Sequence, residues 1–224
     1  MEKELFLNKK YESIWELPIP VFCIDIVIFT YYNWKLCVVL NQKDIDWEMK
    51  YILPWWIMRS WFTLDDNFLS ILNRKTWIDS IFCQQIHVFW DPWYDHRWHT
   101  VSLSYLSLIE SELLLKSADF TKIRLLEFDE LVNIQIWYNF KHKSIIEHAK
   151  YHLIKRLEYT WIAKHLIGPH FTFNSLHLLY EGIYWSKIDI RNFKKKMLSM
   201  KIISETWETD KTNSKKPAML YSFN

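Results

Sequence analysis

The stretch LPWWIMRSWFTLDDNFLSILNRKTWI, residues Leu53 to Ile78, carries the pattern that decides the fold of the N-terminal half. Pro54 begins a tight turn, a loop follows, and a helix is expected from about Leu64 to Arg74. Four apolar residues recur there at the spacing of one helix face: Leu64, Phe68, Ile71 and Leu72. The stretch therefore predicts a loop and an amphipathic helix that covers one face of a sheet.

Composition limits the class of protein. The chain has 224 residues, half of them apolar, which suits two small domains with real cores. Its longest strongly apolar stretch, Val21 to Phe29, is interrupted by Asp25 and is far shorter than the roughly 20 residues needed to cross a bilayer. No signal peptide is evident. Three scattered cysteines lack CxxC spacing, which favours buried thiols over disulfides or zinc. We expect a cytoplasmic protein with no membrane segment, metal or cofactor.

The chain has 14 Trp and 2 Gly, whereas about 7% Gly, roughly 16 residues, is usual for its length. Several Trp occupy positions where turns favour Gly, such as Asn33-Trp34 between two strand-like runs. We therefore hypothesise that many of these Trp are Gly in the native protein, encoded by a reassigned UGA codon. The alternative is a genuinely Trp-rich chain, and the codons in the coding DNA distinguish the two.

The N-terminal half alternates strand-like and helix-like segments. The expected strands are residues 21–30, 35–40, 83–89, 100–109 and 122–128, and residues before Pro18 are expected to form a short helix or arm. Mixed rather than strict strand–helix alternation favours an α+β sandwich.

The C-terminal part changes to helices followed by a hairpin. The expected helices are residues 144–159, 161–167, 174–184 with Thr172 as N-cap, and 190–200 with Asp189 as N-cap. Hairpin strands are expected at residues 202–205 and 218–223, around a polar loop. This order is typical of a winged helix-turn-helix domain.

Charge is distributed unevenly between the two parts. From Lys143 onward there are 14 Lys/Arg and 7 Asp/Glu, net +7, which leaves 14 against 19, net −5, before it. A basic module attached to an acidic one is expected of a nucleic-acid binder.

The helix DIRNFKKKMLSM, Asp189 to Met200, is the expected recognition helix. Its predicted buried face is Ile190, Phe193, Met197 and Leu198. The remaining polar side chains are suited to base edges and phosphates. The predicted DNA-binding residues are Arg191, Asn192, Lys194, Lys195 and Lys196 on this helix, and Lys211, Lys215 and Lys216 in the wing loop. The alternative for any one lysine is an ordinary solvated face.

The stretch from Trp56 to Ile78 has the spacing of a Nudix box, G-x5-E-x7-R-E-U-x-E-E-x-G-U, where U is a bulky aliphatic residue. Only the apolar positions match, at Leu72 and Ile78. The glycines fall on Trp56 and Trp77, and the carboxylates fall on Phe62, Ile71, Arg74 and Lys75. The stretch therefore resembles a Nudix loop–helix–loop without its metal ligands.

Further stretches extend the resemblance over roughly residues 20–224. They include residues 53–56 (family LPGG), 89–101 (family FGDP.RDPRG..VS), 157–160, 171–181, 190–193 and 216–221. Together they resemble the Nudix-related transcription regulators, in which a Nudix-type effector domain precedes a winged helix. The resemblance implies an α/β/α sandwich with a mixed sheet, followed by a winged helix-turn-helix.

The resemblance also implies a small-molecule effector, either ADP-ribose or a related nucleotide, or a sugar. Arg59, Asp91, Asp95 and Arg97 are the predicted polar groups of its pocket, with loop salt bridges as the alternative. Asp65 and Asp66 are expected to stabilise the start of their helix rather than to bind a metal. His148 and His152 are expected on a solvated helix face.

The prediction is thus an effector domain at residues 1–142 and a linker helix with a winged helix at 143–224. We expect a cytoplasmic regulator, a repressor acting as a homodimer on a double-stranded DNA operator, with no catalytic residues. A divergent Nudix hydrolase is the alternative, because metal ligands could come from elsewhere. A protein-interaction module is a third reading.

Overall fold

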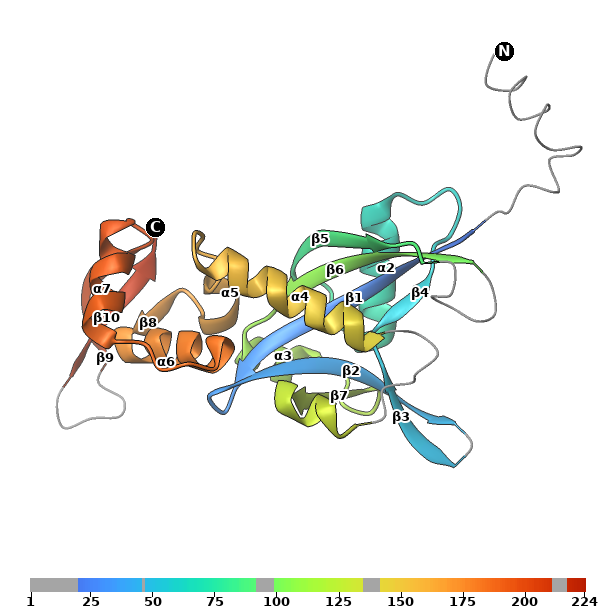
Figure 1. Cartoon of the computed structure of the whole chain (residues 1–224), viewed down its shortest axis with the longest axis horizontal. Helices are drawn as coiled ribbons and strands as arrows, with labels where there is room; N and C mark the ends of the chain where they lie inside the picture. The colour runs from blue at the N-terminus through green and yellow to red at the C-terminus, as the bar shows by residue number, and fades with distance from the viewer. Residues whose placement is uncertain (1–19, 46, 92–98, 135–141, 211–216) are drawn as a thin grey trace, which may run out of the picture.

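The computed structural model describes residues 20–45, 47–91, 99–134, 142–210 and 217–224. The expected N-terminal helix or arm lies outside these residues. A seven-stranded mixed sheet has the order β3-β2-β1-β6-β5, with β4 paired to β1 and β7 paired to β2 (Figure 1). The strands are β1 (Val21–Tyr32), β2 (Lys35–Ile45), β3 (Glu48–Ile52), β4 (Trp55–Ile57), β5 (Phe82–Phe89), β6 (Thr100–Leu108) and β7 (Ile123–Glu127). The α+β class is confirmed, and the pairing of β1 with β6 is parallel whereas its pairing with β2 is antiparallel.

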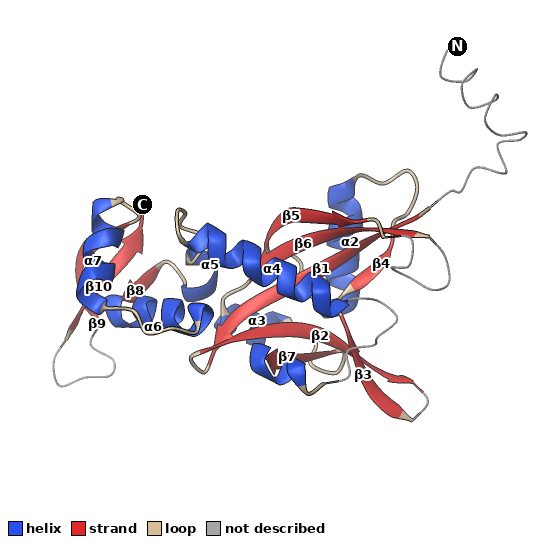
Figure 2. Ribbon diagram, viewed as in Figure 1, coloured by secondary structure: helices blue, strands red, loops and turns tan. Residues whose placement is uncertain are grey.

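Strand β1 is central and is buried on both faces. Because side chains alternate along a strand, Val27 and Phe29 join one hydrophobic core, while Ile26 and Ile28 join the other. The first core includes the apolar face of α4 (His142–Leu157), and the second includes α2 (Leu64–Thr76) and α3 (Ser111–Ser117). Helices therefore cover both faces of the sheet, as Figure 2 shows. This is the expected α/β/α sandwich.

Helix α2 forms where its pattern predicted and extends to Thr76. Thr63 Oγ1 accepts from the Asp66 backbone N–H at 3.1 Å, and the Asp66 carboxylate accepts from the Thr63 backbone N–H. The two bonds form a capping box. Phe68 and Leu72 are buried, whereas Leu64 is exposed, contrary to the expected face. The turn expected at Trp55-Trp56 is wrong, because both residues belong to β4 and pair with Ile24 and Asp25.

Among the residues that the structure describes, six Trp have left-handed backbone conformations. They are Trp34, Trp47, Trp61, Trp77, Trp185 and Trp207, with φ between 56° and 71°. An L side chain in this region costs roughly 1–2 kcal/mol per residue, and glycine is its usual occupant. The predicted β1–β2 hairpin turn is confirmed, with φ of 49° at Asn33 and 64° at Trp34, the type I′ pattern that favours Asn-Gly. These angles support the hypothesis of recoded glycines.

The C-terminal unit contains α5 (Lys164–Ile167), β8 (His170–Thr172), α6 (Phe173–Tyr184), α7 (Ile190–Ser199), β9 (Ile203–Asp210) and β10 (Ala218–Phe223). The hairpin β9–β10 pairs with β8, which the sequence did not predict. In the N-terminal unit, a short 3₁₀ helix, η2 (Phe128–Val132), follows β7. Both predicted N-caps are confirmed: Thr172 accepts from the Ser175 N–H, and Asp189 accepts from the Asn192 N–H. The arrangement is a winged helix-turn-helix.

The winged helix packs closely on the β1–β2 hairpin. Tyr31 Oη donates a 2.8 Å hydrogen bond to the Leu178 carbonyl of α6. At Gly182 on the same helix, a Cβ atom would come within 3.0 Å of the Tyr31 ring and 3.2 Å of the Trp34 carbonyl. One hydrophobic core runs from the sheet through α4 to the winged helix, so the two units are in direct contact. Among the described residues, no helix has both the length and the apolar character of a membrane span.

Candidate effector pocket and nucleic-acid interface

A pocket of about 380 Å³ opens at the C-terminal end of α2. It lies between this end, strands β2 to β4, and the segment before β7. Four of its lining residues are basic, Lys43, Arg74, Lys75 and Lys122, and none is acidic. Its size falls in the range of small-molecule sites. The pocket is therefore suited to an anionic ligand.

Arg74 and Lys75 occupy the box positions that carry paired carboxylates in the Nudix pattern. The Arg74 guanidinium lies 4.4 Å from the centre of the Trp56 ring, and Lys75 Nζ lies 4.6 Å from it. Neither side chain forms an ion pair with a carboxylate of the described residues. Burial, and then the charge of Arg59, lower the pKa of Arg74; burial, and then Arg74 and Lys43, lower the pKa of Lys75. Both cations thus lack a neutralising partner.

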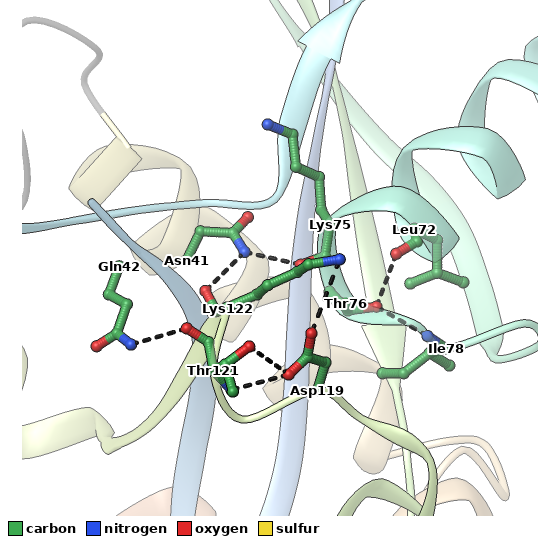
Figure 3. Close-up of polar contacts among 9 residues, drawn as sticks. All are labelled: Asn41, Gln42, Leu72, Lys75, Thr76, Ile78, Asp119, Thr121 and Lys122. Carbon is green, nitrogen blue, oxygen red and sulfur yellow. Dashed lines mark hydrogen bonds and ion pairs between the residues drawn. The ribbon is translucent and has the colours of Figure 1, made fainter. Parts of the chain in front are cut away.

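Asn41 holds together two of the segments that line the pocket. Its Nδ2 donates to the Lys75 carbonyl at 2.8 Å and to the Lys122 carbonyl at 3.2 Å, as Figure 3 shows. One buried amide thus joins the end of α2 to the segment before β7. Lys122 Nζ is engaged elsewhere, 3.7 Å from Asp119 and 4.6 Å from the Trp77 ring centre. Unlike Lys122, Arg74 and Lys75 have no carboxylate partner among the described residues.

Of the predicted effector residues, Arg59 and Asp91 are not among those that line this pocket. Arg59 lies on the loop before α2, where its guanidinium donates to Ser70 Oγ at 2.8 Å and stacks 4.3 Å from the Phe62 ring centre. Asp91 is exposed beyond β5. Asp95 and Arg97 lie outside the described residues. The sequence signal for the pocket was the replacement of the box carboxylates by Arg74 and Lys75, which the sequence interpretation counted only as a loss.

The described residues contain no group of three His, Cys, Asp or Glu side chains that could hold a metal ion. Asp66 serves the capping box of α2, in line with the expected role at the helix start. Nothing in this part of the chain therefore fits a Nudix metal centre.

A buried polar contact connects the pocket side of the sheet to α4. His142, the first residue of α4, places Nε2 3.2 Å from Asp25 Oδ1, and both side chains are 1% exposed. The Leu53 N–H donates to His142 Nδ1 at 3.1 Å, and Ser102 donates to the other Asp25 oxygen. Leu53 directly precedes the segment with pocket residues Trp55 and Trp56. Leu53 and His142 therefore connect the pocket segment directly to helix α4.

Helix α7 presents its polar residues around an outward face. Phe193 and Met197 are buried against the winged helix, as predicted. Ile190 and Leu198 are 43% and 37% exposed, so their assignment to the buried face is wrong. A short surface helix buries only a narrow face, because successive residues are 100° apart around its axis. Phe193 and Met197 occupy that face. Arg191 and Lys195 lie one turn apart and are exposed.

The other predicted DNA-binding residues differ in their surroundings. Lys194 is half-buried, with Nζ 3.9 Å from Glu205 of β9. Asn192 and Lys196 are exposed and also line a groove of about 400 Å³ between α4, α6 and α7. Lys211, Lys215 and Lys216 lie outside the described residues. Of the predicted DNA-binding residues on α7, Arg191 and Lys195 are consequently the two that are exposed and do not line this groove.

His148 and His152 are half-buried, so the predicted solvated face is wrong. Their Nε2 atoms are 3.2 Å apart, and the His148 ring centre lies 4.5 Å from that of His87 on β5. Burial first, and then neighbouring cationic or titratable groups, lower the pKa of both imidazoles. These residues therefore pack α4 against β5.

Comparison with known proteins supports the two-part architecture. Residues 163–223 match the family model of the NrtR DNA-binding winged helix domain. The chain is 25% identical, over 99% of its length and 88% of the other protein, to the ADPR responsive transcriptional repressor NtrR of Acinetobacter baylyi. Its fold is similar to that of Shewanella oneidensis NrtR complexed with a 27mer DNA, with a TM-score of 0.79, 20% identity, and coverage of 91% of this chain and 93% of the other. It is also similar to the NUDIX domain of that NrtR complexed with ADP ribose, with a TM-score of 0.53, 21% identity, and coverage of 68% and 99%.

Proposed function

We propose that this chain is a member of the Nudix-related transcription regulators, a DNA-binding repressor whose operator affinity is controlled by ADP-ribose or a closely related nucleotide. The observation that carries the proposal is the basic pocket at α2, joined through α4 to a winged helix with an exposed basic helix. The A. baylyi relative is named as an ADPR responsive repressor.

The proposed DNA contact is made by α7. Arg191 and Lys195 project where guanidinium and ammonium groups can meet base edges and phosphates. One winged helix contacts a half-site, so we propose a homodimer on a palindromic operator in the cytoplasm. Ligand binding would then alter the relative position of the two α7 helices, because α4 is anchored to the sheet through His142.

The first test is a gel-shift titration of the full chain on the DNA upstream of its own operon. We expect binding that weakens steeply with salt, because phosphate contacts release counterions, and that changes when ADP-ribose is added. A shuffled DNA of the same length is the control. Binding that is absent, or insensitive to salt, would contradict a DNA-binding function; sedimentation of the complex tests the dimer.

We also propose that the effector domain binds its ligand without hydrolysing it. Hydrolysis by a Nudix box requires clustered carboxylates around Mg²⁺, and the pocket has Arg74 and Lys75 in that place. Incubation with ADP-ribose and Mg²⁺ should leave the nucleotide intact by chromatography. Mg²⁺-dependent release of AMP and ribose phosphate would instead establish the hydrolase alternative.

The division at residue 143 remains a prediction. It places almost all of α4 with the winged helix, although α4 packs on the sheet. Limited proteolysis tests it: cleavage just before α4 supports the division, and cleavage after Leu157 would assign α4 to the effector domain.

A further inference from the structure

The ligand pocket at α2 combines positive charge with an absence of acid. Arg74 and Lys75 face it, and none of the described residues that line it is Asp or Glu. Both cations contact the Trp56 ring, and the nearby charges are positive: Arg59 for Arg74, and Arg74 and Lys43 for Lys75. An aromatic face attracts a cation but leaves its charge in place. A bound anion would neutralise the pair.

The two cations also occupy the positions that decide how a diphosphate is held. In the box pattern, a carboxylate pair at these positions holds a divalent metal, and the metal in turn contacts the diphosphate. A carboxylate pair alone would repel phosphate oxygens, so such a site needs the metal. A guanidinium offers paired donors that match phosphate geometry, and an ammonium offers a compact positive charge. Arg74 and Lys75 therefore supply, from the protein itself, the positive charge that a divalent metal ion supplies in the box pattern.

A purely structural role for the pair is the competing explanation. Cations in the last turn of a helix interact favourably with its dipole, and Arg74 and Lys75 lie in the last turn of α2. That role requires no particular side-chain direction. Yet both side chains line the pocket wall, and burial lowers the pKa of both, with Arg59 adding to the effect on Arg74, and Arg74 and Lys43 adding to the effect on Lys75. Such crowding opposes the charged state and is relieved by an anion.

We propose that Arg74 and Lys75 bind the diphosphate of the effector directly, so that this domain recognises a nucleoside diphosphate without a divalent metal ion. This inference rests on the proposed function for the identity of the effector. It does not depend on DNA binding.

The test is calorimetric titration of the full chain with ADP-ribose, and separately with inorganic pyrophosphate, in Mg²⁺ and in excess EDTA. We expect the Kd for each ligand to agree within about twofold between the two buffers. Arg74→Gln and Lys75→Gln should each weaken binding about tenfold, as for loss of one charge-assisted hydrogen bond. Lys116→Gln on α3 is the matched control, because Lys116 is exposed and does not line the pocket; it should leave binding unchanged.

A carboxylate variant separates direct binding from a structural role. Arg74→Glu with Lys75→Glu should abolish binding in EDTA and leave at most Mg²⁺-dependent binding. The melting temperature and ligand-free DNA affinity report whether the fold is kept. Loss of wild-type binding in EDTA would overturn the proposal, as would glutamine variants that bind like wild type. Pyrophosphate binding without ADP-ribose binding would support the anion site and reject only the nominated effector. If neither ligand binds while DNA does, the inference fails and the DNA-binding function stands.

Discussion

At the end of α2, Arg74 and Lys75 lie in a concave pocket against Trp56, whereas on α7 Arg191 and Lys195 project from a convex, exposed face. Partial burial lowers the pKa of the first pair. Similar residues are therefore suited to different ligands according to the shape of their surroundings: a concave pair can enclose one small anion, and a convex pair can follow a polyanion. Helix α4 lies between the two sites, and Figure 1 shows it reaching from the sheet toward the winged helix.

Charge reversal on α7 should give the largest effect and should leave the pocket intact. With Arg191→Glu and Lys195→Glu, four side chains of the proposed dimer reverse their charge, so operator affinity should fall on the order of 1000-fold, with a shallower dependence on salt. The measurement is fluorescence anisotropy of labelled operator at several salt concentrations. ADP-ribose affinity is the internal control and should stay the same. An unchanged operator affinity would mean that α7 does not face DNA.

Removal of His142 should disconnect the two sites. His142→Ala leaves Asp25 buried without its imidazole partner and frees the start of α4, which should cost about 3 kcal/mol of unfolding free energy. Chemical denaturation measures the loss, with exposed His170→Ala as the control. At a temperature where the variant is folded, ADP-ribose and DNA should each still bind, while the effect of one on the other declines. If ADP-ribose changes the DNA affinity of the variant as much as that of the wild type, α4 does not transmit the effect of the ligand.

The helix end beside each site offers a matched pair of Trp substitutions. Trp77 ends α2 and Trp185 ends α6, both in left-handed conformations, with φ of 66° and 56°. Trp77→Gly and Trp185→Gly should each raise the unfolding free energy by about 1 kcal/mol, because the left-handed penalty exceeds the greater chain entropy of Gly.

Trp161→Gly is the control for that pair, because Trp161 is also exposed but is not among the positive-φ residues. It should give no gain in thermal stability. A gain at Trp161 equal to those at Trp77 and Trp185 would show that loss of an exposed ring, rather than backbone strain, is responsible. TGA codons at these positions in the coding DNA would establish the recoding, and TGG codons would refute it.

Local chemistry explains which parts of the fold the sequence predicts. The caps at Thr172 and Asp189 and the hairpin turn at Asn33-Trp34 depend on neighbouring residues, and all three form as expected. The short strands β4 and β8 were missed because each pairs with a strand that is distant in sequence. Strand β3 was also missed, although it pairs with the adjacent β2. Short strands have little pattern of their own.

The candidate pocket was missed for a similar reason. Its lining comes from β2, β3 and β4, the end of α2 and the segment before β7, and single-segment patterns do not bring these together. The burial of His148 and His152 depends likewise on β5, which lies far away in the sequence. Only the position of Arg74 and Lys75 in the box could have pointed to the pocket.

The smallest predicted effect concerns pH and the packing of α4 on β5. His148 and His152 have pKa values lowered first by burial; His87 from β5 lowers both further, with His152 acting on His148 and Arg156 on His152. Folding therefore favours their neutral forms. Their contribution to stability is fully present above the unfolded pKa of about 6.5 and is lost as pH falls through their lower folded values.

Thermal unfolding at several pH values between about 7.5 and 5 tests this dependence. In the wild-type protein the melting temperature should fall toward the acid end. His148→Gln with His152→Gln should flatten that fall, because an amide keeps a polar contact and does not titrate in this range. His170→Gln, which changes an exposed imidazole on β8, should reproduce the wild-type slope. If the double variant also does so, the titrating groups lie elsewhere; His165, stacked on Phe82 with a pKa lowered by burial and then by Lys164, is the next to replace.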